Sequence, residues 1–457
     1  GDALLAAKEI LATHPQATAE ILLVFGEEAL RPLAHRSLDR LLVTVGSRAS
    51  LLPSSAATSL RITQNSWELC LDGVFGFQFR PPMDDATAEL LARVNTHPRI
   101  KLRAALDLPS GLGDANAGTV FRADFTYATG IVKSPVLAEA NAPYVGRVRY
   151  LDLGFFVEAR SGSTPPVGRG IPDEPATAER VLLASVLRPL AELRTPQSDK
   201  RTYGHLLIVG GSRSYPGAVL MTVQAALRSG VGLLTAFVPA SLAPEYATHF
   251  PEAMWVGMPE TTNGGLATSG AKLVLEKLER ATALAMGPGL GAESETIELL
   301  REVLRNTQKP ALLDADALRP EVLAAAQGGV ICTPHAGEFE RIGGRAVIEK
   351  AGAAERIVVL KGPTTRILGR DSHPTYLSFF GGPVLARGGS GDILAGLIGG
   401  LLAQKSGDLL LAAARGVVWH GLAADLLARD RGQVAVQTTQ LLDYLEPALR
   451  FADHETT

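Results

Sequence analysis

The feature of this sequence that most constrains its fold is the repeated alternation of short apolar runs with longer segments of helical character. Short runs rich in β-branched residues are typical of strands, and their alternation with helices predicts βαβ units around a mostly parallel sheet. Hydrophobic residues make up 46% of the chain, which allows large cores to be buried. The sequence therefore predicts an α/β protein, in which ligands bind beyond the carboxyl ends of the strands.

The alternation occurs twice, and a stretch without periodicity separates the two occurrences. Residues Ser161–Pro175, SGSTPPVGRGIPDEP, are rich in Pro, Gly and Ser, which is typical of an interdomain linker. We therefore predict a first domain over residues 1–160, a linker over residues 161–180 and a second domain over residues 181–457.

In the first domain, two carboxylates directly follow predicted strands. Asp72 comes after Trp67–Leu71 and Asp107 comes after Lys101–Leu106, so both are expected at the ligand-binding edge of a sheet. Taken alone, either aspartate could equally be a helix or turn cap. The other elements expected here are a helix over Leu4–Ala12 and strands over Ile21–Phe25, Leu41–Val45 and Val148–Leu153.

In the second domain, each predicted strand ends in a turn that carries Gly, Asp, His or Lys. The strand His205–Gly211 runs into glycines and is followed by a predicted helix over Gly217–Leu227. Further strands are expected over Leu284–Met286, Ala311–Leu313, Gly329–Cys332 and Ile357–Leu360.

The strongest chemical signal is the glycine-rich segment RGGSGDILAGLIGGLLAQ, residues 387–404. Its glycines, Gly391 among them, allow a tight loop that opens into an apolar helix near Ile393, and a helix N-terminus attracts phosphate. Asp392 lies at that terminus and could accept a proton from a substrate hydroxyl during phosphoryl transfer. On the loop alone, an ordinary aspartate cap is an equally good interpretation. The segment is neither a P-loop nor a GxGxxG dinucleotide fingerprint.

Two neighbouring segments add groups suited to a nucleotide. The segment VLKGPTTRI offers a cation, close backbone approach and hydroxyls through Lys361, Gly362, Pro363, Thr364 and Thr365. In ICTPHAGEFERI, His335 and Glu338 are three residues apart and share a face if a helix begins there. Glu338 could hold Mg²⁺ through water and His335 could contact substrate, although His335 alone is also compatible with a capping or surface histidine.

Six ordered motifs of the second domain carry a family resemblance: GGS…YPGA, MGPGLG, DADAL, TPHxGE, KGxxT and GGSGDxLAG. From about Asp199 onward the chain resembles the ADP/ATP-dependent NAD(P)H-hydrate dehydratases, which implies a ribokinase-like three-layer fold. The resemblance implies that Asp392 is the general base, and Gly382 stands where the family usually has Asn. It also implies substrate contacts from Ala218, Gly289, His335 and Asp392, and nucleotide contacts from Lys361, Gly362, Pro363, Thr364, Thr365 and Gly391.

The first domain resembles the NAD(P)H-hydrate epimerases through WELCLDGVFGFQFRPP and AALDLPSGL. This resemblance implies a Rossmann-like three-layer fold, with Asp72 and Ser110 as potassium ligands and Asp107 as the acid/base candidate. The family's glycine-rich loop reads Asn-Asn-Gly-Gly-Asp-Gly, and Gly1, Asp2 and Ala3 resemble its last three residues with alanine in place of the last glycine. The implied substrate contacts are Asp107 and the loop Gly76, Phe77, Gln78, Phe79, Arg80, Pro81 and Pro82.

Together, the two resemblances imply a bifunctional repair enzyme for hydrated NADH and NADPH. One domain would interconvert the R and S hydrates, and the other would dehydrate the S hydrate with ADP (or ATP), Mg²⁺ and K⁺ as the implied cofactors. The alternatives are a ribokinase-like kinase for a small vitamin-precursor alcohol, which would release a stable phosphorylated product, and a non-catalytic nucleotide-binding sensor.

Charge, hydrophobicity and cysteine content limit the partners and the cellular location that we expect. The formal net charge is −3 and no long basic run is present, so nucleic acid is not an expected partner. No apolar run reaches the roughly 18 residues of a membrane span, and no signal peptide is visible. Two cysteines, Cys70 and Cys332, are too few for a disulfide framework, which favours a cytoplasmic location. A homo-oligomer is expected because domains of this type commonly self-associate.

Overall fold

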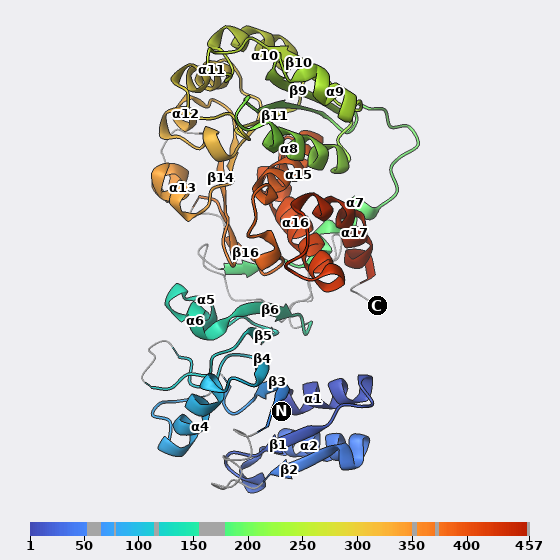
Figure 1. Cartoon of the computed structure of the whole chain (residues 1–457), viewed down its shortest axis with the longest axis vertical. Coiled ribbons are helices and arrows are strands. Elements are labelled where there is room, and N and C mark those ends of the chain that lie inside the picture. The colour runs from blue at the N-terminus through green and yellow to red at the C-terminus, as the bar shows by residue number, and fades with distance from the viewer. Residues whose placement is uncertain are drawn as a thin grey trace, which may run out of the picture. The chain divides into compact units, whose positions relative to one another are not determined.

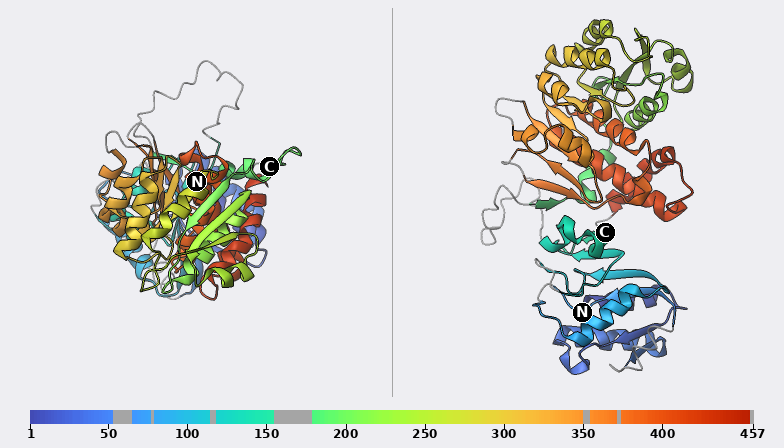
Figure 2. Two further views of the ribbon diagram at one scale, coloured as in Figure 1. Left: turned by 90° about the horizontal axis from the view of Figure 1, so that it is seen from above. Right: turned by 60° about the vertical axis from the view of Figure 1, so that its left-hand side comes forward.

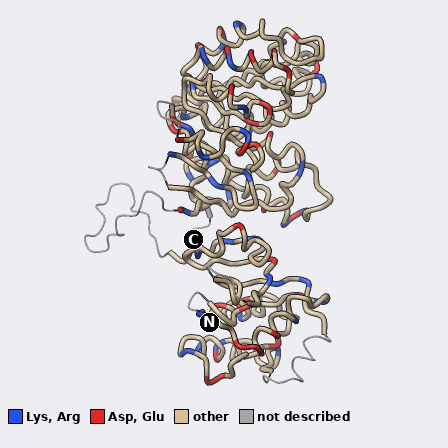
Figure 3. The backbone as a smooth tube through the Cα atoms, turned by 90° about the vertical axis from the view of Figure 1, so that its left-hand side faces the viewer, with Lys and Arg blue, Asp and Glu red and all other residues tan. Residues whose placement is uncertain are grey.

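In the computed structural model, the chain forms two compact units, Gly1–Val167 and Gly168–Thr457. The structure describes residues 1–52, 65–76, 79–113, 118–154, 179–349, 354–370 and 374–454. The division between the units falls inside the predicted linker, most of which lies outside the described residues. Figure 3 shows Lys and Arg interspersed with Asp and Glu along both units.

The centre of the first unit is a four-stranded parallel sheet in the order β3-β4-β5-β6. Helix α4, Asp85–Thr96, begins at Asp84, whose carboxylate accepts a hydrogen bond from the N–H of Thr87. Buried side chains of α4 and β4 share one core with Phe121, which is 1% exposed. The strands are β3 (Trp67–Asp72), β4 (Ile100–Leu106), β5 (Phe125–Thr129) and β6 (Arg147–Leu151), and the short helices α5 (Ser134–Leu137) and α6 (Ala142–Val145) lie between β5 and β6.

A second, two-stranded parallel sheet pairs β1, Ala19–Leu22, with β2, Ala49–Leu52. It packs with α1 (Asp2–Thr13) and α2 (Pro32–Val45), so the predicted helix near the start is confirmed.

The predicted strand over Leu41–Val45 is wrong, because these residues end α2. Leu38, Leu41 and Val45 are buried at intervals of three and four, which is the period of a helix face, whereas Val43 is 85% exposed.

The second unit is built on one ten-stranded sheet in the order β10-β9-β8-β11-β12-β13-β14-β15-β16-β7. All neighbours pair in parallel except β14 with β15 and β15 with β16. The strands are β7 (Glu179–Val181), β8 (His205–Val209), β9 (Leu233–Pro239), β10 (Met254–Met258), β11 (Ala283–Met286), β12 (Ala311–Leu313), β13 (Val330–Cys332), β14 (Arg356–Leu360), β15 (Thr365–Leu368) and β16 (Thr375–Ser378).

Helices cover both faces of this sheet, as Figures 1 and 2 show. Alternate residues of one strand enter different cores: Leu206 and Ile208 join the first, and Leu207 and Val209 join the second. The first core contains α8 (Pro216–Arg228), α9 (Ala243–His249), α15 (Ser390–Gln404), α16 (Leu409–Arg431) and α17 (Leu445–His454). The second contains α10 (Ala271–Leu278), α11 (Ser294–Arg305), α12 (Pro320–Ala325) and α14 (Ala346–Glu349), with α13 (Ala336–Arg341) beside it. The predicted α/β class is confirmed.

The expectation that no segment is long and apolar enough for a membrane span is wrong for helix α16, Leu409–Arg431. By length and composition this helix passes that test, but 78% of its apolar window is buried inside the second unit. The core helix of a soluble protein has the same properties, so α16 is weak support for a membrane segment.

Candidate active sites

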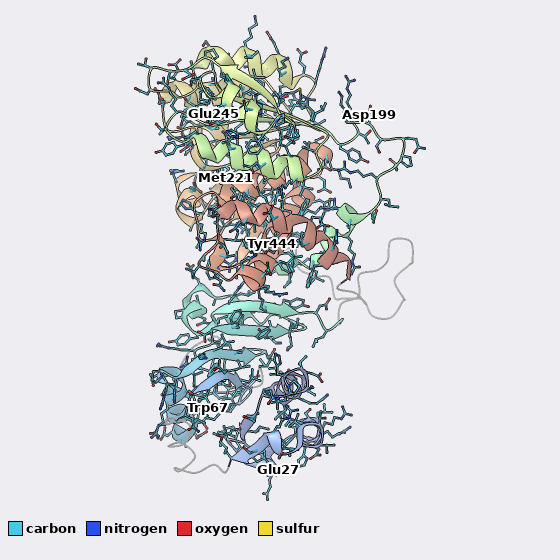
Figure 4. The ribbon with its side chains drawn as sticks, turned by 45° about the vertical axis from the view of Figure 1, so that its right-hand side comes forward. Glu27, Trp67, Asp199, Met221, Glu245 and Tyr444 are labelled. Carbon is cyan, nitrogen blue, oxygen red and sulfur yellow. The ribbon has the colours of Figure 1, made fainter. Side chains whose placement is uncertain are left out.

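The glycine-rich loop of the second unit ends at Gly389, the N-cap of α15, with φ 90°. Residues with a side chain rarely adopt this left-handed φ, and a Cβ here would also lie 2.4 Å from the Sδ of Met221, which Figure 4 labels on α8, so this position favours glycine. Gly389 has no capping side chain, and among the described residues only the first N–H of the turn, that of Ser390, donates to a carbonyl oxygen, that of Arg387, so the N–H groups of Gly391 and Asp392 are left for an anion. Helix α15 begins at Ser390, slightly earlier than expected, which places Asp392 inside this turn.

Close packing fixes the direction of α15. A Cβ at Gly396 would lie 2.2 Å from the carbonyl oxygen of Thr222 in α8, so the two helices approach to backbone contact. The apolar GDILAGLIGG pattern thus lets α15 lie in the core and aim its N-terminus at the edge of the sheet.

Lys361 brings a positive charge to the same place from the end of β14. Its Nζ lies 3.1 Å from Oδ1 of Asp314, which follows β12, and that oxygen also accepts a hydrogen bond of 2.7 Å from the hydroxyl of Thr333. A Cβ at Gly391 would lie 3.3 Å from the same Nζ. The predicted nucleotide residues Lys361 and Gly391 are therefore neighbours, although they are 30 positions apart in the sequence.

Asp392 is mostly buried beside these groups. Burial raises the pKa of its carboxyl to about 6, the charges of Asp314 and Asp316 raise it as well, and Lys361 lowers it. A carboxylate with such a pKa accepts a proton near neutral pH, which suits a general base. The positive end of the α15 dipole favours the ionised form of this carboxyl, whereas burial and the charges of Asp314 and Asp316 oppose ionisation.

Two other predicted substrate contacts lie together at the ends of β8 and β11. A Cβ at Gly289 would lie 3.0 Å from the Cβ of Ala218, at the start of α8. The hydroxyl of Ser212 donates to the carbonyl oxygen of Gly289 at 2.8 Å, and the N–H of Gly291 donates to Asp316 at 2.8 Å. Because Asp316 lies two residues after Asp314, these turns form one continuous loop cluster with the pair of Asp314 and Lys361.

His335 and Glu338 form a capping box at the start of α13. Glu338 accepts from the N–H of His335 at 2.9 Å, and Nδ1 of His335 accepts from the N–H of Glu338 at 3.3 Å. The side chain of His335 is 63% exposed, whereas that of Glu338 is 11% exposed. His335 thus keeps a face open to a ligand while it caps, and the carboxylate of Glu338 is largely used by the cap.

The remaining predicted nucleotide residues lie in the turn that joins β14 to β15. Gly362, Pro363 and Thr364 make the turn, and Thr365 begins β15. The N–H of Lys361 donates to the carbonyl oxygen of Pro334 at 2.8 Å, so this turn and the start of α13 are held side by side.

Sequence interpretation missed His420 of α16, which is 6% exposed. Burial lowers its pKa to about 4, and its Nε2 has no hydrogen-bond partner among the described residues. A histidine inside an apolar helical run gives no signal that separates such a residue from an ordinary core position.

In the first unit, Asp72 and Ser110, the two implied potassium ligands, are hydrogen-bonded to each other. Asp72 accepts from the Ser110 hydroxyl at 2.6 Å and from the Ser110 N–H at 2.7 Å. Burial raises the pKa of Asp72 to about 6, and the hydrogen bonds from Ser110 lower it. Ala3 packs against Gly73, the residue after β3, so the first residues of the chain lie beside this pair.

Asp107 follows β4 with a left-handed backbone, φ 75°. Few residues other than glycine adopt such a conformation, and those that do are often functional. Its Oδ1 accepts from the Thr129 hydroxyl at 3.3 Å and forms an ion pair with Lys133. Sequence interpretation missed Lys133.

The predicted substrate loop lies next to Asp107. A Cβ at Gly76 would lie 3.8 Å from Oδ2 of Asp107. Phe75, Phe79 and the half-exposed Phe25 form an aromatic cluster, with centroid separations of 5.5 and 4.4 Å. Phe79 and Pro81 also line a small hollow, and Arg80, Pro81 and Pro82 are exposed. Phe77 and Gln78 lie outside the described residues.

The residues described by the structure contain no cluster of three or more His, Cys, Asp or Glu side chains arranged to hold a metal ion. Cys70 and Cys332 are free thiols, and burial raises the pKa of each to about 12.

Comparisons with known proteins cover both units. A family described as NAD(P)H-hydrate dehydratase matches residues 206–447, and one described as the N-terminus of YjeF-related proteins matches residues 1–134. The bifunctional NAD(P)H-hydrate repair enzyme of Moorella thermoacetica is 32% identical over 100% of this chain and 86% of its own length. That of Escherichia coli K12 is 32% identical over 83% of this chain and 71% of its own length.

Solved structures resemble the second unit. A ribokinase-like superfamily protein from Enterococcus faecalis is 27% identical with a TM-score of 0.51, covering 60% of this chain and 96% of its own. An ADP/ATP-dependent NAD(P)H-hydrate dehydratase from Bacillus subtilis, co-crystallized with ATP/Mg²⁺, is 29% identical with a TM-score of 0.51, covering 59% of this chain and 97% of its own. The ribokinase-like fold of the second unit is thus confirmed. With relatives that match both units over most of their length, the chain belongs to the family of bifunctional NAD(P)H-hydrate repair enzymes.

Proposed function

We propose that the second unit dehydrates the S hydrate of NADH or NADPH by phosphorylating the added hydroxyl at the expense of ADP or ATP and then eliminating phosphate. The observation that carries this proposal is the convergence of Asp392, Lys361 and the open N-terminus of α15 within one loop cluster. Such a site offers a base, a cation and phosphate-binding N–H groups, which are the parts that phosphoryl transfer requires.

In this proposal, Asp392 accepts the proton of the ring hydroxyl as the oxygen attacks the terminal phosphorus. Lys361 and the N–H groups of the first turn of α15 neutralise the charge on the transferred group. Phosphate then leaves with the C–O bonding electrons, and loss of a proton from the neighbouring ring carbon restores the double bond. Phosphate is a far better leaving group than hydroxide, so a kinase-like site can drive a dehydration.

Nucleotide and Mg²⁺ binding are supported by the Bacillus subtilis dehydratase that was co-crystallized with ATP/Mg²⁺. In this chain the nucleotide would contact Lys361 to Thr365 and Gly391, with the hydrated substrate near Ala218, Gly289 and His335. Glu338 would contribute to Mg²⁺ through water only with Oε1, which accepts no capping hydrogen bond and lies 3.6 Å from Nε2 of His335. A preference for ADP over ATP remains a proposal.

We propose that the first unit interconverts the R and S hydrates, with Asp107 as the acid/base group and the loop from Gly76 to Pro82 against the substrate. Asp72 and Ser110 would hold K⁺, because their oxygens lie side by side in a buried position. Since the dehydratase consumes one epimer, an epimerase in the same chain would make the whole pool of damaged nucleotide repairable. A homo-oligomeric state and a cytoplasmic location are further proposals, the latter supported by two free thiols.

The decisive experiment supplies purified protein with mixed R and S NADH hydrates, Mg²⁺, and ADP or ATP in parallel, and follows the return of reduced-nicotinamide absorbance. Recovery of the S fraction is expected with nucleotide, together with release of inorganic phosphate. Complete conversion of both epimers, faster than their spontaneous interconversion, is expected if the first unit is active. A stable phosphorylated product would identify a small-molecule kinase, and nucleotide binding without turnover would identify a sensor.

A further inference from the structure

The two carboxylate oxygens of Asp107 have different surroundings. Oδ1 accepts a hydrogen bond from the Thr129 hydroxyl at 3.3 Å and forms the ion pair with Lys133. Oδ2 lies next to Gly76, where a Cβ would be 3.8 Å away, so this oxygen is near the predicted substrate loop. One oxygen is therefore held by the protein, and the other is presented to the proposed substrate position.

Lys133 is itself held in place. Its Nζ also donates to the carbonyl oxygen of Thr129 at 3.3 Å, and its carbonyl oxygen accepts from the N–H of Val136 at the start of α5. Asn141 ties the same helix down through a 2.8 Å hydrogen bond to the carbonyl oxygen of Pro135. The lysine therefore projects from a braced segment that follows directly after β5.

The Lys133–Asp107 pair differs from an ordinary surface ion pair of the same sheet. The side chains of Lys133 and Asp107 are 14% and 17% exposed. Those of Lys101 and Glu68, which pair between β4 and β3, are 69% and 81% exposed. Exposed pairs contribute little because solvent screens them and both side chains remain mobile, whereas a largely buried pair with a second acceptor fixes its geometry.

We propose that Lys133 is a positioning residue for the epimerase reaction, and this proposal rests on the proposed function of the first unit. Lys133 and Thr129 engage Oδ1 and thereby turn Oδ2 toward the hydroxyl-bearing ring carbon. Because the ammonium group is bound to Oδ1 and to a backbone carbonyl, it does not compete with the substrate hydroxyl for Oδ2. Its role is in the orientation of Asp107, and it does not itself exchange a proton with the substrate.

The test measures conversion of purified R NADH hydrate to the S epimer by the full-length protein, without nucleotide, so that dehydration does not occur. Lys133→Met is expected to lower kcat about 100-fold, which is the effect of misplacing a catalytic group by roughly 1 Å, with KM changed less than about threefold. Lys133→Arg keeps the charge, and its kcat is expected to be at least about tenfold higher than that of Lys133→Met. Lys101→Met, the matched control, is expected to stay within about twofold of the unsubstituted protein.

A kcat within about threefold of the unsubstituted protein in Lys133→Met would overturn the proposal, as would a change in KM alone, which indicates direct substrate binding. If thermal unfolding shows that Lys133→Met does not fold, Thr129→Val decides. That variant removes the second contact to Oδ1 and is expected to lower kcat about tenfold, and an unchanged kcat would overturn the proposal. An inactive unsubstituted protein would instead refute the proposed epimerase function.

Discussion

Both units place a lysine next to a carboxylate at the end of a parallel strand, but they pair the two charges differently. In the first unit, Lys133 forms its ion pair with Asp107, the candidate acid/base residue itself. In the second unit, Lys361 pairs with Asp314, and the candidate base Asp392 has no ion pair among the described residues. The lysine of the second unit thus acts on its base only through its electric field.

The two units thus differ in how the protein makes a carboxylate suitable for proton transfer. Asp392 is left mostly buried among like charges, so its pKa rises to about 6 and a proton can be taken and returned near neutral pH. In the first unit the carboxylate with a pKa raised to about 6 is Asp72, which is hydrogen-bonded to Ser110, whereas Asp107 is oriented by Lys133. In the second unit, burial therefore raises the pKa of the candidate base itself. In the first unit, an ion pair holds the candidate acid/base residue Asp107, and the raised pKa belongs to a different carboxylate, Asp72.

The largest expected effect tests whether Asp392 is the base. Asp392→Asn keeps the shape of the side chain but cannot accept the proton, so kcat for dehydration of the S hydrate is expected to fall about 10³-fold. Nucleotide affinity, measured by calorimetry, is expected to remain within about threefold. Phosphate release within tenfold of the unsubstituted protein would remove Asp392 from this role and break the comparison.

A second effect tests whether Lys361 acts on Asp392 through its field. Lys361→Met is expected to lower kcat/KM for the nucleotide roughly 100-fold, because a cation at the phosphate site is lost. Since Lys361 lowers the pKa of Asp392, its removal raises that pKa. In the pH profile of kcat/KM, the fall on the acidic side is expected near pH 6 in the unsubstituted protein. In Lys361→Met this acidic limb should therefore move to higher pH.

The matched control for Lys361→Met is Lys405→Met, which changes an exposed lysine at the other end of α15. It should change neither kcat/KM nor the acidic limb. An acidic limb that stays in place in Lys361→Met would show that the lysine serves the nucleotide alone.

The sequence predicted the parts of the sites that depend on local pattern. The glycine loop before Asp392 and the capping pair His335 and Glu338 lie within short segments, where glycine content and helix spacing are informative. In the fold, the strand over Leu41–Val45 was predicted wrongly because four apolar residues in five hide the helical period that Leu38 reveals.

Side-chain contacts between segments that are distant in the sequence could not be predicted from local pattern. The contact of Lys133 with Asp107 requires the pairing of β4 with β5, in which Leu106 lies opposite Tyr127. The contact of Lys361 with Asp314 joins residues 47 positions apart, across β12, β13 and β14. Strand order decides both contacts, and no local pattern in the chain specifies it.

A third prediction concerns the stability cost of the buried base. The folded pKa of Asp392, about 6, lies above its ordinary value of 3.8, so its contribution to stability is present below pH 3.8 and is lost as the pH rises through about 6. At about 1.4 kcal/mol per pKa unit, and with partial solvent exposure, Asp392→Asn is expected to stabilise the second unit by about 2 kcal/mol at pH 7. Urea unfolding followed by the fluorescence of Trp255 and Trp419 measures this. Equal stabilities at pH 7 would show that Asp392 is better solvated than its burial implies.

The smallest expected effect concerns Asp72, the carboxylate of the first unit whose pKa is raised in the same way. Ser110→Ala removes a hydroxyl that donates to the buried Asp72 at 2.6 Å, which is expected to destabilise the first unit by about 1.5 kcal/mol at pH 8. That hydrogen bond lowers the pKa of Asp72, so the variant raises it, and the destabilisation should shrink as the pH falls below about 6 and the carboxyl becomes neutral.

Ser37→Ala is the matched control, because the buried Ser37 hydroxyl donates at 2.9 Å to the carbonyl oxygen of Leu33, an acceptor that does not titrate. Its cost, measured by the fluorescence of Trp67 during urea unfolding, should not depend on pH. A pH-independent cost for Ser110→Ala as well would mean that Asp72 is neutral throughout, and the resemblance between Asp72 and Asp392 would not extend to their charge.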